Sequence, residues 1–324
     1  MASHSEPKTL QQAILFFSDY ANCHKALMVI RWPDGAVKCP TCGSEKVAYL
    51  ENARVWKCYE QHSRAKFSLK VGTIFEDSAI PLQKWLPALW LLTGAKNGIS
   101  SYELARALGV TQKTAWFMLS RLRLALQREH GGKMSGAVEV DETFIGGKAR
   151  YMHAAKKRRM GISQGRSMAG KVAVLGLLER HGKDGHSVVR VQGLDGRKKR
   201  HLQENVRRFV EVGATVHTDE LFSYQGLEKS GFVHNVINHA EKYVDGEVHT
   251  NGMENFWSLL KRAIKGTYVS VEPFHLFRYL DEQAFRFNNR KGTDAMRFAL
   301  ALKGIINKRL TYAALTGSEL PQTC

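Results

Sequence analysis

The order of strand-like and helix-like segments between residues 137 and 220 constrains the fold of this chain most strongly. Three β-rich segments come first, followed by an amphipathic helix and a fourth β-rich segment. They read AVEVDETF, KVAVLGLLE, HSVVRVQGL, HLQENVRRFVEV and ATVHTDE. This is the order of the ribonuclease H fold, in which the first and fourth strands are neighbours. We therefore expect an α/β, ribonuclease H-like core, a mixed sheet flanked by helices.

Two acidic residues lie on the strands that this fold brings together. Asp141 falls within the first strand, and Asp219 ends the fourth. An acid in an otherwise apolar strand needs a partner, because an unpaired buried charge is costly. Glu139 and Glu142 compete with Asp141 for the same role, and Glu220 competes with Asp219. The sequence predicts that Asp141 and Asp219 lie side by side.

A third carboxylate comes from the helical segment NGMENFWSLLKR. Glu254 lies in its first turn and could face a metal ion there. The same residue also fits a capping box, with Asn251 as N-cap and Glu254 at N3, and both roles can hold at once. Lys261 follows seven residues later on the same helix face. It could contact a substrate phosphate or base, or form a solvent-exposed salt bridge.

Three carboxylates from separate elements suit a particular chemistry. They can hold two Mg²⁺ or Mn²⁺ ions about 3.5–4 Å apart, and such a pair clamps the attacking and leaving oxygens of a phosphodiester. The acids at 141, 219 and 254 therefore predict a metal-dependent polynucleotidyl transferase.

The composition favours a nucleic-acid partner. The 324 residues include 48 Lys and Arg against 30 Asp and Glu, a formal charge of +18. This excess indicates a polyanionic partner rather than a charge that only maintains solubility. No apolar stretch approaches the roughly 18 residues of a membrane span, and the first residues lack the order of a secretory signal. We expect a cytoplasmic protein without a membrane partner.

A zinc ribbon is predicted in the amino-terminal third. Cys39 and Cys42 form C-x2-C, and Cys58 follows at a spacing typical of zinc ribbons. A standard ribbon would close with a second C-x2-C, but here C-x3-H offers His62, and three thiolates with one imidazole are a sound donor set. The alternatives are that the site is incomplete or that Cys23 or His24 supplies the fourth ligand.

Helical segments flank and follow the ribbon. Residues 8–30 have the apolar spacing of one helix, and residues 81–127 look helical. Within the latter, Gly109 and a second helix over about 112–124, capped by Thr111, fit a helix-turn-helix, although an ordinary helical hairpin fits as well. The candidate DNA contacts of this helix are Gln112, Lys113, Thr114 and Arg121.

Further basic residues lie in the second half of the chain. Residues 148–171 form a Lys- and Arg-rich segment that we expect to be a loop contacting phosphates, and residues 197–201 extend it. The candidate contacts in the second half are Lys157, Arg158, Arg159, Lys265, Arg286 and Arg290.

The strings EVDETFIGGK, HTDELFSY and HTNGMENFWSLLKRAIKGTY resemble the DDE-type insertion-sequence transposases of the ISXO-two-like group. The similarity covers nearly the whole chain, because WKC and FSLKVGTIFEDSAIPLQKW resemble the zinc-ribbon region of that group. Matched by motif, Asp141 and Asp219 are the first two acids. Members of the group often have Asn at the third position, here Asn251, whereas the spacing and Lys261 favour Glu254. His62 departs from the cysteine of the group.

This resemblance implies a transposase that binds terminal inverted repeats of double-stranded DNA as a homo-oligomer. It would hydrolyse a phosphodiester and join the freed 3′-hydroxyl to target DNA. Two alternatives remain: a ribonuclease H-like nuclease or resolvase without strand transfer, and a catalytically silent DNA-binding regulator. The expected domains are an N-terminal helical segment (1–34), zinc ribbon (35–78), helix-turn-helix-like region (79–130), catalytic domain (131–296), and C-terminal helix and tail (297–324).

Overall fold

The computed structural model of the chain folds into two compact units. The ribbon unit comprises residues 1–128 and 291–324, and the sheet unit comprises residues 129–290. The structure describes residues 7–127, 131–146, 153–159, 171–182, 185–194, 199–219, 224–237 and 249–317. None of the helices in these ranges is long and apolar enough to cross a membrane.

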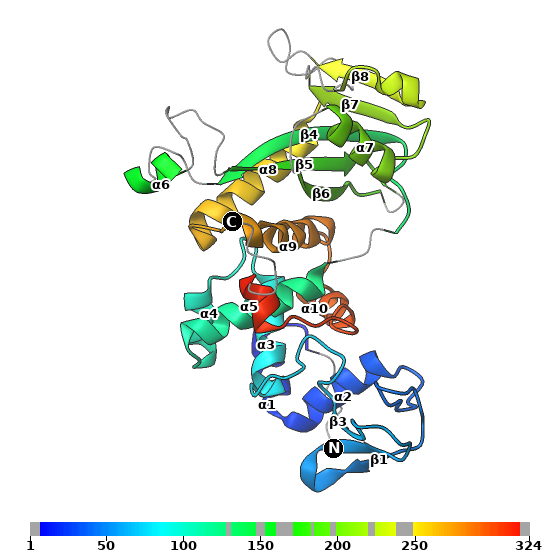
Figure 1. Cartoon of the computed structure of the whole chain (residues 1–324), viewed down its shortest axis with the longest axis vertical. Helices are drawn as coiled ribbons and strands as arrows, with labels where there is room; N and C mark the ends of the chain where they lie inside the picture. Colours follow the sequence, from blue (N-terminus) through cyan, green and yellow to red (C-terminus); the bar gives the residue numbers. More distant parts are fainter. Residues whose placement is uncertain are drawn as a thin grey trace. The chain divides into compact units, whose positions relative to one another are not determined.

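The sheet unit is built on a five-stranded mixed sheet (Figure 1). Its strands in chain order are β4 (Ala137–Gly146), β5 (Lys171–Glu179), β6 (Val188–Leu194), β7 (Thr215–Asp219) and β8 (Val233–Ile237). Their spatial order is β6-β5-β4-β7-β8. β4 pairs antiparallel with β5 and parallel with β7. The predicted fold and the predicted neighbourhood of the first and fourth strands are confirmed.

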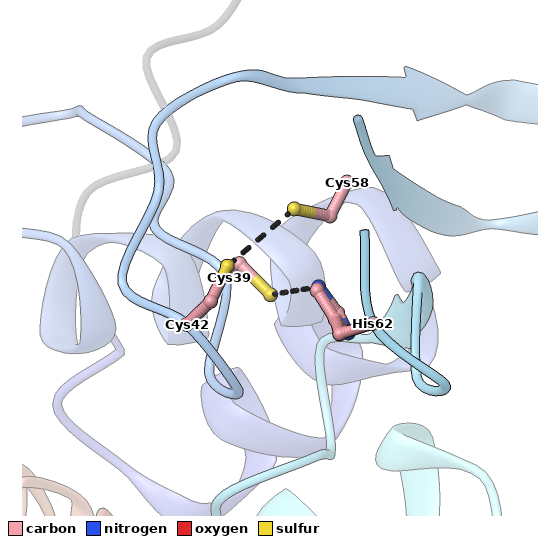
Figure 2. Close-up of side chains that lie close together, drawn as sticks. All are labelled: Cys39, Cys42, Cys58 and His62. Carbon is pink, nitrogen blue, oxygen red and sulfur yellow. Dashed lines mark hydrogen bonds between the residues drawn. The ribbon is translucent and has the colours of Figure 1, made fainter. Parts of the chain in front are cut away.

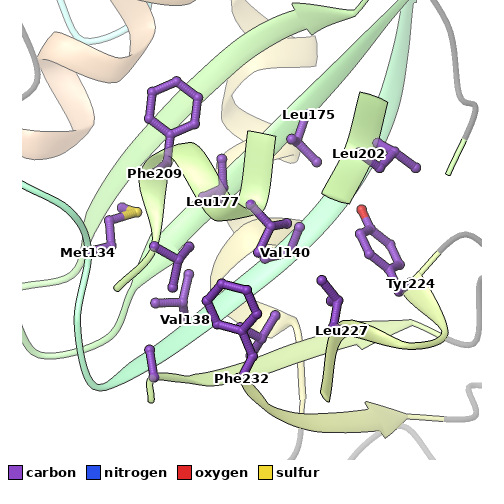
Figure 3. Packing of buried hydrophobic residues seen from close by; sticks show 14 of the residues in the cluster. Met134, Val138, Val140, Leu175, Leu177, Leu202, Phe209, Tyr224, Leu227 and Phe232 are labelled. Atoms are coloured by element: carbon purple, nitrogen blue, oxygen red, sulfur yellow. The ribbon is translucent and has the colours of Figure 1, made fainter. Parts of the chain in front are cut away.

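Helices cover both faces of this sheet, and successive side chains of each strand point alternately to one face and the other. Val138 and Val140 of β4 belong to one apolar cluster with Leu202 and Phe209 of α7 (Lys199–Phe209), as Figure 3 shows. The opposite face packs against α8 (Asn251–Ala263) and α9 (Leu276–Asn288). Because successive side chains of a strand point to opposite faces, Glu139 and Asp141 point toward the α8 face. The other described elements of the sheet unit are α6 (Ala154–Arg159), η4 (Leu227–Ser230), η5 (Ile264–Tyr268) and η6 (Pro273–His275).

The ribbon unit begins with two helices rather than the single helix expected over residues 8–30. α1 spans Leu10–Ser18 and α2 spans Tyr20–Arg31. Asp19 between them has an extended backbone, and its side chain accepts a hydrogen bond from the Ala21 amide at 2.9 Å. The expectation was wrong because this N-cap starts a new helix within an apolar pattern that continues across it.

A three-stranded antiparallel sheet follows, formed by β1 (Val47–Leu50), β2 (Val55–Cys58) and β3 (Lys66–Ser68), with η1 (Glu51–Ala53) between the first two strands. The rest of the unit is helical: α3 (Leu82–Gly94), α4 (Ser101–Leu108), α5 (Gln112–Leu126), α10 (Asp294–Lys303) and α11 (Tyr312–Thr316). Phe298 of α10 lies 5.3 Å from Phe17 and 5.1 Å from Trp90, measured between ring centroids. α10 therefore completes a core begun by α1 and α3.

The turn between α4 and α5 has the predicted chemistry. Gly109 ends α4 in the left-handed conformation, with φ +59°. Thr111 caps α5 by accepting a hydrogen bond from the Thr114 amide at 3.2 Å. The two roles assigned to these residues are thus present.

Candidate active site and zinc site

Asp141 and Asp219 converge on the α8 face of the sheet. β4 and β7 run parallel with Glu139 opposite His217, so the next residues on the same face are the two aspartates. A ligand oxygen of each, together with one of Glu142, lies within 4.8 Å of the other two. Three carboxylates this close repel one another unless protons or cations neutralise them. Glu220, a rival of Asp219, falls outside the described residues.

The environment of Asp141 favours a neutralised carboxylate. Its Oδ2 accepts a hydrogen bond from Trp257 Nε1 at 2.9 Å, and its Oδ1 accepts one from the Glu142 amide at 2.7 Å. Burial, and then the negative charges of Asp219 and Glu254, raise the pKa of Asp141 from 3.8 to about 6 despite these bonds. A bound divalent cation would remove this penalty. Sequence reasoning missed the Trp257 contact, because it assigned roles on this helix only to Asn251, Glu254 and Lys261.

Tyr224 provides a second sign of accumulated negative charge. Its side chain is fully buried in the α7-side core. Burial, followed by the charge of Glu142 and then of Asp219 and Asp141, raises the pKa of the Tyr224 hydroxyl well above its usual value. Glu142 appeared in the sequence as a competitor of Asp141, whereas in the structure both contribute to one acidic cluster.

Glu254 is exposed in the first turn of α8. It is not among the three carboxylates within 4.8 Å, yet its charge contributes to the raised pKa of Asp141. Asn251, the other candidate, is exposed at the first residue of the helix. Lys261 is half-buried two helical turns beyond Glu254.

The predicted capping box of α8 is wrong. The N-cap is Thr250, whose side chain makes no cap hydrogen bond. The amide of Met253 instead donates to Oε2 of Glu139 at 2.8 Å. In a capping box the N-cap side chain accepts the hydrogen bond of this amide, whereas here Glu139 of β4 accepts it. Glu254 takes no part in the cap.

Four donor atoms converge in the ribbon, as Figure 2 shows. Cys39 Sγ lies 3.5 Å from His62 Nε2, and Cys42 Sγ lies 3.7 Å from Cys58 Sγ. A tetrahedral zinc ion with ordinary bond lengths requires about 3.8 Å between two sulfurs and about 3.6 Å between sulfur and nitrogen. The donor set and its spacing therefore fit structural zinc, with His62 in the fourth position.

The alternative zinc ligands have other contacts. His24 stacks on Trp56 with ring centroids 5.5 Å apart. Cys23 is buried and donates to the Phe17 carbonyl at 3.2 Å, and burial followed by the charge of Asp19 raises the pKa of its thiol to about 12. A thiol with so high a pKa is a poor source of the thiolate that zinc binds.

Comparisons with known proteins match the regions that contain the two sites. The family model described as "ISXO2-like transposase domain" matches residues 133–288, and that described as "Transposase zinc-ribbon domain" matches residues 18–60. An uncharacterized protein in transposable element ISH50 of Halobacterium salinarum is 30% identical over 287 residues, which cover 85% of this chain and 93% of that relative. The chain belongs to the ISXO2-like transposase family. An uncharacterized transposase-like protein of Haemophilus influenzae is 34% identical over 84 residues, 26% of this chain and 68% of the relative.

Two arginines of this ISXO2-like chain that were expected to contact DNA are buried instead. Arg121 is 4% exposed and donates to the carbonyl oxygens of Ile74 and Glu76 at 3.0 and 2.5 Å. Arg286 is 8% exposed and is paired with Glu282 one turn earlier in α9. Each guanidinium is therefore bound to acceptors of its own unit rather than facing solvent.

The other candidate DNA contacts differ in their availability. Lys113 and Lys265 are exposed, and Lys157 and Arg158 lie on α6. Gln112 donates to the Ser101 hydroxyl at 2.8 Å, and Arg290 donates to the Ser187 carbonyl at 3.0 Å. The side chain of Arg159 and residues 160–170 fall outside the described residues. Of α5, Lys113 in the first turn is therefore the exposed candidate, since Met118–Arg123 are buried.

Proposed function

We propose that this chain is an active insertion-sequence transposase, which cleaves a phosphodiester at the element end and joins the 3′-hydroxyl to target DNA. Asp141, Asp219 and Glu254 are its metal ligands, and Glu142 adds a further carboxylate. The observation that carries this proposal is the close approach of Asp141, Glu142 and Asp219 in a member of a transposase family. Mg²⁺ or Mn²⁺ bound there would activate water and stabilise charge on the attacking and leaving oxygens.

The residues of the chain orient these ligands and the substrate. Trp257 holds one oxygen of Asp141 and leaves the carboxylate facing Asp219. Glu254 on α8 is near enough for its charge to raise the pKa of Asp141, and this proximity supports it as the third ligand. Lys261 on the same helix face would bind a phosphate next to the scissile bond.

The DNA partner follows from charge and exposure. The excess of 48 Lys and Arg over 30 Asp and Glu, together with exposed Lys113 and Lys265, supports binding of double-stranded DNA. The ribbon, the first turn of α5 and the α6 region would contact the terminal inverted repeats. Joining two ends requires at least two copies of the chain, so a homo-oligomer on DNA, in the bacterial nucleoid, belongs to the proposal.

A strand-transfer assay tests this function. Purified chain is incubated with Mn²⁺, a pre-cut element end and plasmid DNA, and joined products are counted. We expect Asp141→Ala, Asp219→Ala and Glu254→Ala each to reduce joining by at least about 100-fold, because each removes a metal ligand. Glu204→Ala is the matched control, since Glu204 is an exposed acid on α7.

The outcomes separate the alternatives. Cleavage of uncut ends without joining by the wild-type chain would indicate a nuclease or resolvase. Specific DNA binding that survives Asp141→Ala, without cleavage or joining in either protein, would indicate a regulator. Loss of joining in Asn251→Ala but not in Glu254→Ala would move the third ligand to Asn251.

A further inference from the structure

Glu139 is a buried carboxylate that lies next to the acidic cluster but is directed elsewhere. It is 1% exposed and lies two residues before Asp141 on β4, on the same face of the sheet. A buried carboxylate is stable only when its charge is paired and its oxygens are hydrogen-bonded. Its partners therefore indicate what it does.

Each oxygen of Glu139 has a separate partner. Oε1 accepts a hydrogen bond from Arg180 Nε at 2.7 Å and lies 3.4 Å from His249 Nδ1. Arg180 Nη2 in turn lies 2.8 Å from His249 Nδ1 and donates to the His249 carbonyl. Oε2 accepts the amide of Met253 at the beginning of α8. Glu139 thus joins β4, the residue after β5 and the segment that leads into α8.

Two hydrogen bonds attach α8 to β4 at matched intervals. Met253 binds Glu139 and Trp257 binds Asp141. Two residues along a strand advance about 6.6 Å, and four along a helix advance about 6 Å. The two bonds therefore fit a helix that lies along the strand, an arrangement visible for α8 in Figure 1.

Two glycines allow the helix to approach this closely. A Cβ on Gly252 would lie 2.8 Å from Glu139 Oε2, and a Cβ on Gly176, which is paired with Asp141, would lie 2.1 Å from Met253 Cε. Either distance is too short for a real Cβ. At both bonds, therefore, side chains of the interface occupy the space that a Cβ on the glycine would need.

We propose that Glu139, held by Arg180, is a positioning residue that fixes the position of α8 along β4 and so sets Glu254 and Trp257 against Asp141. This inference rests on the proposed metal site. Glu139 itself is not a metal ligand, because Arg180 neutralises its charge and its oxygens are already bound. Without Glu139, α8 loses the bond nearest Glu254 while keeping the bond through Trp257.

The experiment separates positioning from simple helix capping. We compare the full-length wild-type chain, Glu139→Gln, Glu139→Ala and the double variant Glu139→Ala/Thr250→Asp. Thr250 is the buried N-cap and makes no side-chain cap bond, and the aspartate is introduced there to offer the helix a local acceptor in place of Glu139. Thermal unfolding, hydrogen exchange of residues 249–257, Mn²⁺ affinity by electron paramagnetic resonance and strand transfer are measured for each.

We expect Glu139→Ala to weaken Mn²⁺ binding by about 10-fold or more, the range seen when groups that orient metal ligands are removed. The double variant should regain thermal stability and exchange protection but not Mn²⁺ affinity. Glu139→Gln, which keeps an acceptor for Met253 but loses the charge that pairs with Arg180, should fall between wild type and Glu139→Ala.

Two results would overturn the proposal. One is full recovery of Mn²⁺ affinity in the double variant, which would make Glu139 a helix cap only. The other is unchanged Mn²⁺ affinity in Glu139→Ala. Because the affinity is measured without DNA, a wild-type chain that binds Mn²⁺ but joins no ends would contradict the proposed function and leave the role of Glu139 tested.

Discussion

Three carboxylates within four residues of β4 have three different environments. Glu139 is neutralised by Arg180 and caps α8. Asp141 is held by Trp257 and faces Asp219. Strand alternation directs Glu142 away from the α8 face, yet one of its oxygens lies in the same cluster. After burial, its charge is the main cause of the raised pKa of Tyr224. Local position along the strand, rather than residue type, separates the acid that we propose positions α8 from those that we propose bind metal.

The charge of Asp141 should destabilise the metal-free protein near neutral pH. Asp141→Asn keeps an acceptor for Trp257 and removes the repulsion from Asp219 and Glu254. We expect it to raise the free energy of unfolding at pH 7.5, without Mg²⁺ or Mn²⁺, by at most about 3 kcal/mol, because each pKa unit corresponds to about 1.4 kcal/mol. Chemical denaturation between pH 4 and pH 8 measures the difference.

The direction of this pH dependence follows from linkage. The pKa of Asp141 in the folded state, about 6, exceeds its ordinary value of 3.8, so the folded protein holds this proton more tightly than the unfolded chain. Wild type should lose stability relative to Asp141→Asn as pH rises from about 4 to about 6. A difference in the free energy of unfolding between the two proteins that does not change with pH would contradict this account. With added Mg²⁺ at pH 7.5, wild type should become the more stable of the two.

For single residues, the sequence predicted which acids lie together better than it predicted the hydrogen-bond partners of the residues around them. Asp141 and Asp219 could be predicted because strand order alone brings their positions together. Glu139 could not be distinguished from Asp141, since its partners Arg180 and Met253 lie 41 and 114 residues further along the chain. The burial of Arg121 was missed for the same reason, because its acceptors lie more than 40 residues away.

Among the elements, the packing of α8 on β5 requires a residue without a side chain at position 176, which is Gly176. A Cβ on Gly176 would also lie 2.6 Å from the ring of Trp257. We expect Gly176→Ala to lower the free energy of unfolding by about 1–3 kcal/mol, as overpacking in a core does, and to displace Trp257 from Asp141. Urea denaturation with Mn²⁺ affinity as a second readout measures both effects.

Gly193 offers a matched control. It also lies within a strand, β6, but a Cβ there would meet no heavy atom within 4 Å. Gly193→Ala should therefore change the free energy of unfolding by no more than about 0.5 kcal/mol. If the two substitutions lower the free energy of unfolding equally, the loss comes from replacing glycine within a strand and not from the limited space beside α8.

The helices and strands themselves were largely predictable, but the break between α1 and α2 and the cap of α8 were not. Alternation and apolar runs located the strands of the sheet, because those patterns reflect burial directly. Asp19 escaped notice as a helix break because the apolar spacing runs through it. The cap of α8 was misassigned because the sequence offers a local capping box, whereas the folded chain uses Glu139 from a distant strand.

At the scale of the whole molecule, zinc should stabilise one unit and leave the other unchanged, because each unit has its own core. We expect His62→Ala to lower zinc content and to increase hydrogen exchange over residues 39–68, with exchange in β4, β5 and β7 unaffected. His62→Cys should retain zinc, since four thiolates are also a good donor set. Full zinc content in His62→Ala would indicate a different fourth ligand.

The sequence indicated residues 297–324 as a segment of their own, and the structure groups residues 291–324 with the ribbon unit. Nothing in local sequence indicates this association. Phe298 meets Phe17 and Trp90, which lie more than 200 residues earlier, and Arg297 donates to the Thr93 carbonyl at 3.1 Å. Long-range partners of this kind cannot be read from periodicity.

The late position of α10 in the chain affects folding during synthesis. The ribosome makes Phe17 and Trp90 before the sheet unit and Phe298 after it. Domains usually fold in the order in which they leave the ribosome. Here the first unit to emerge cannot complete its core until α10 has been made. The sheet unit, with its acidic cluster, is therefore complete in the nascent chain while the ribbon unit still lacks part of its core.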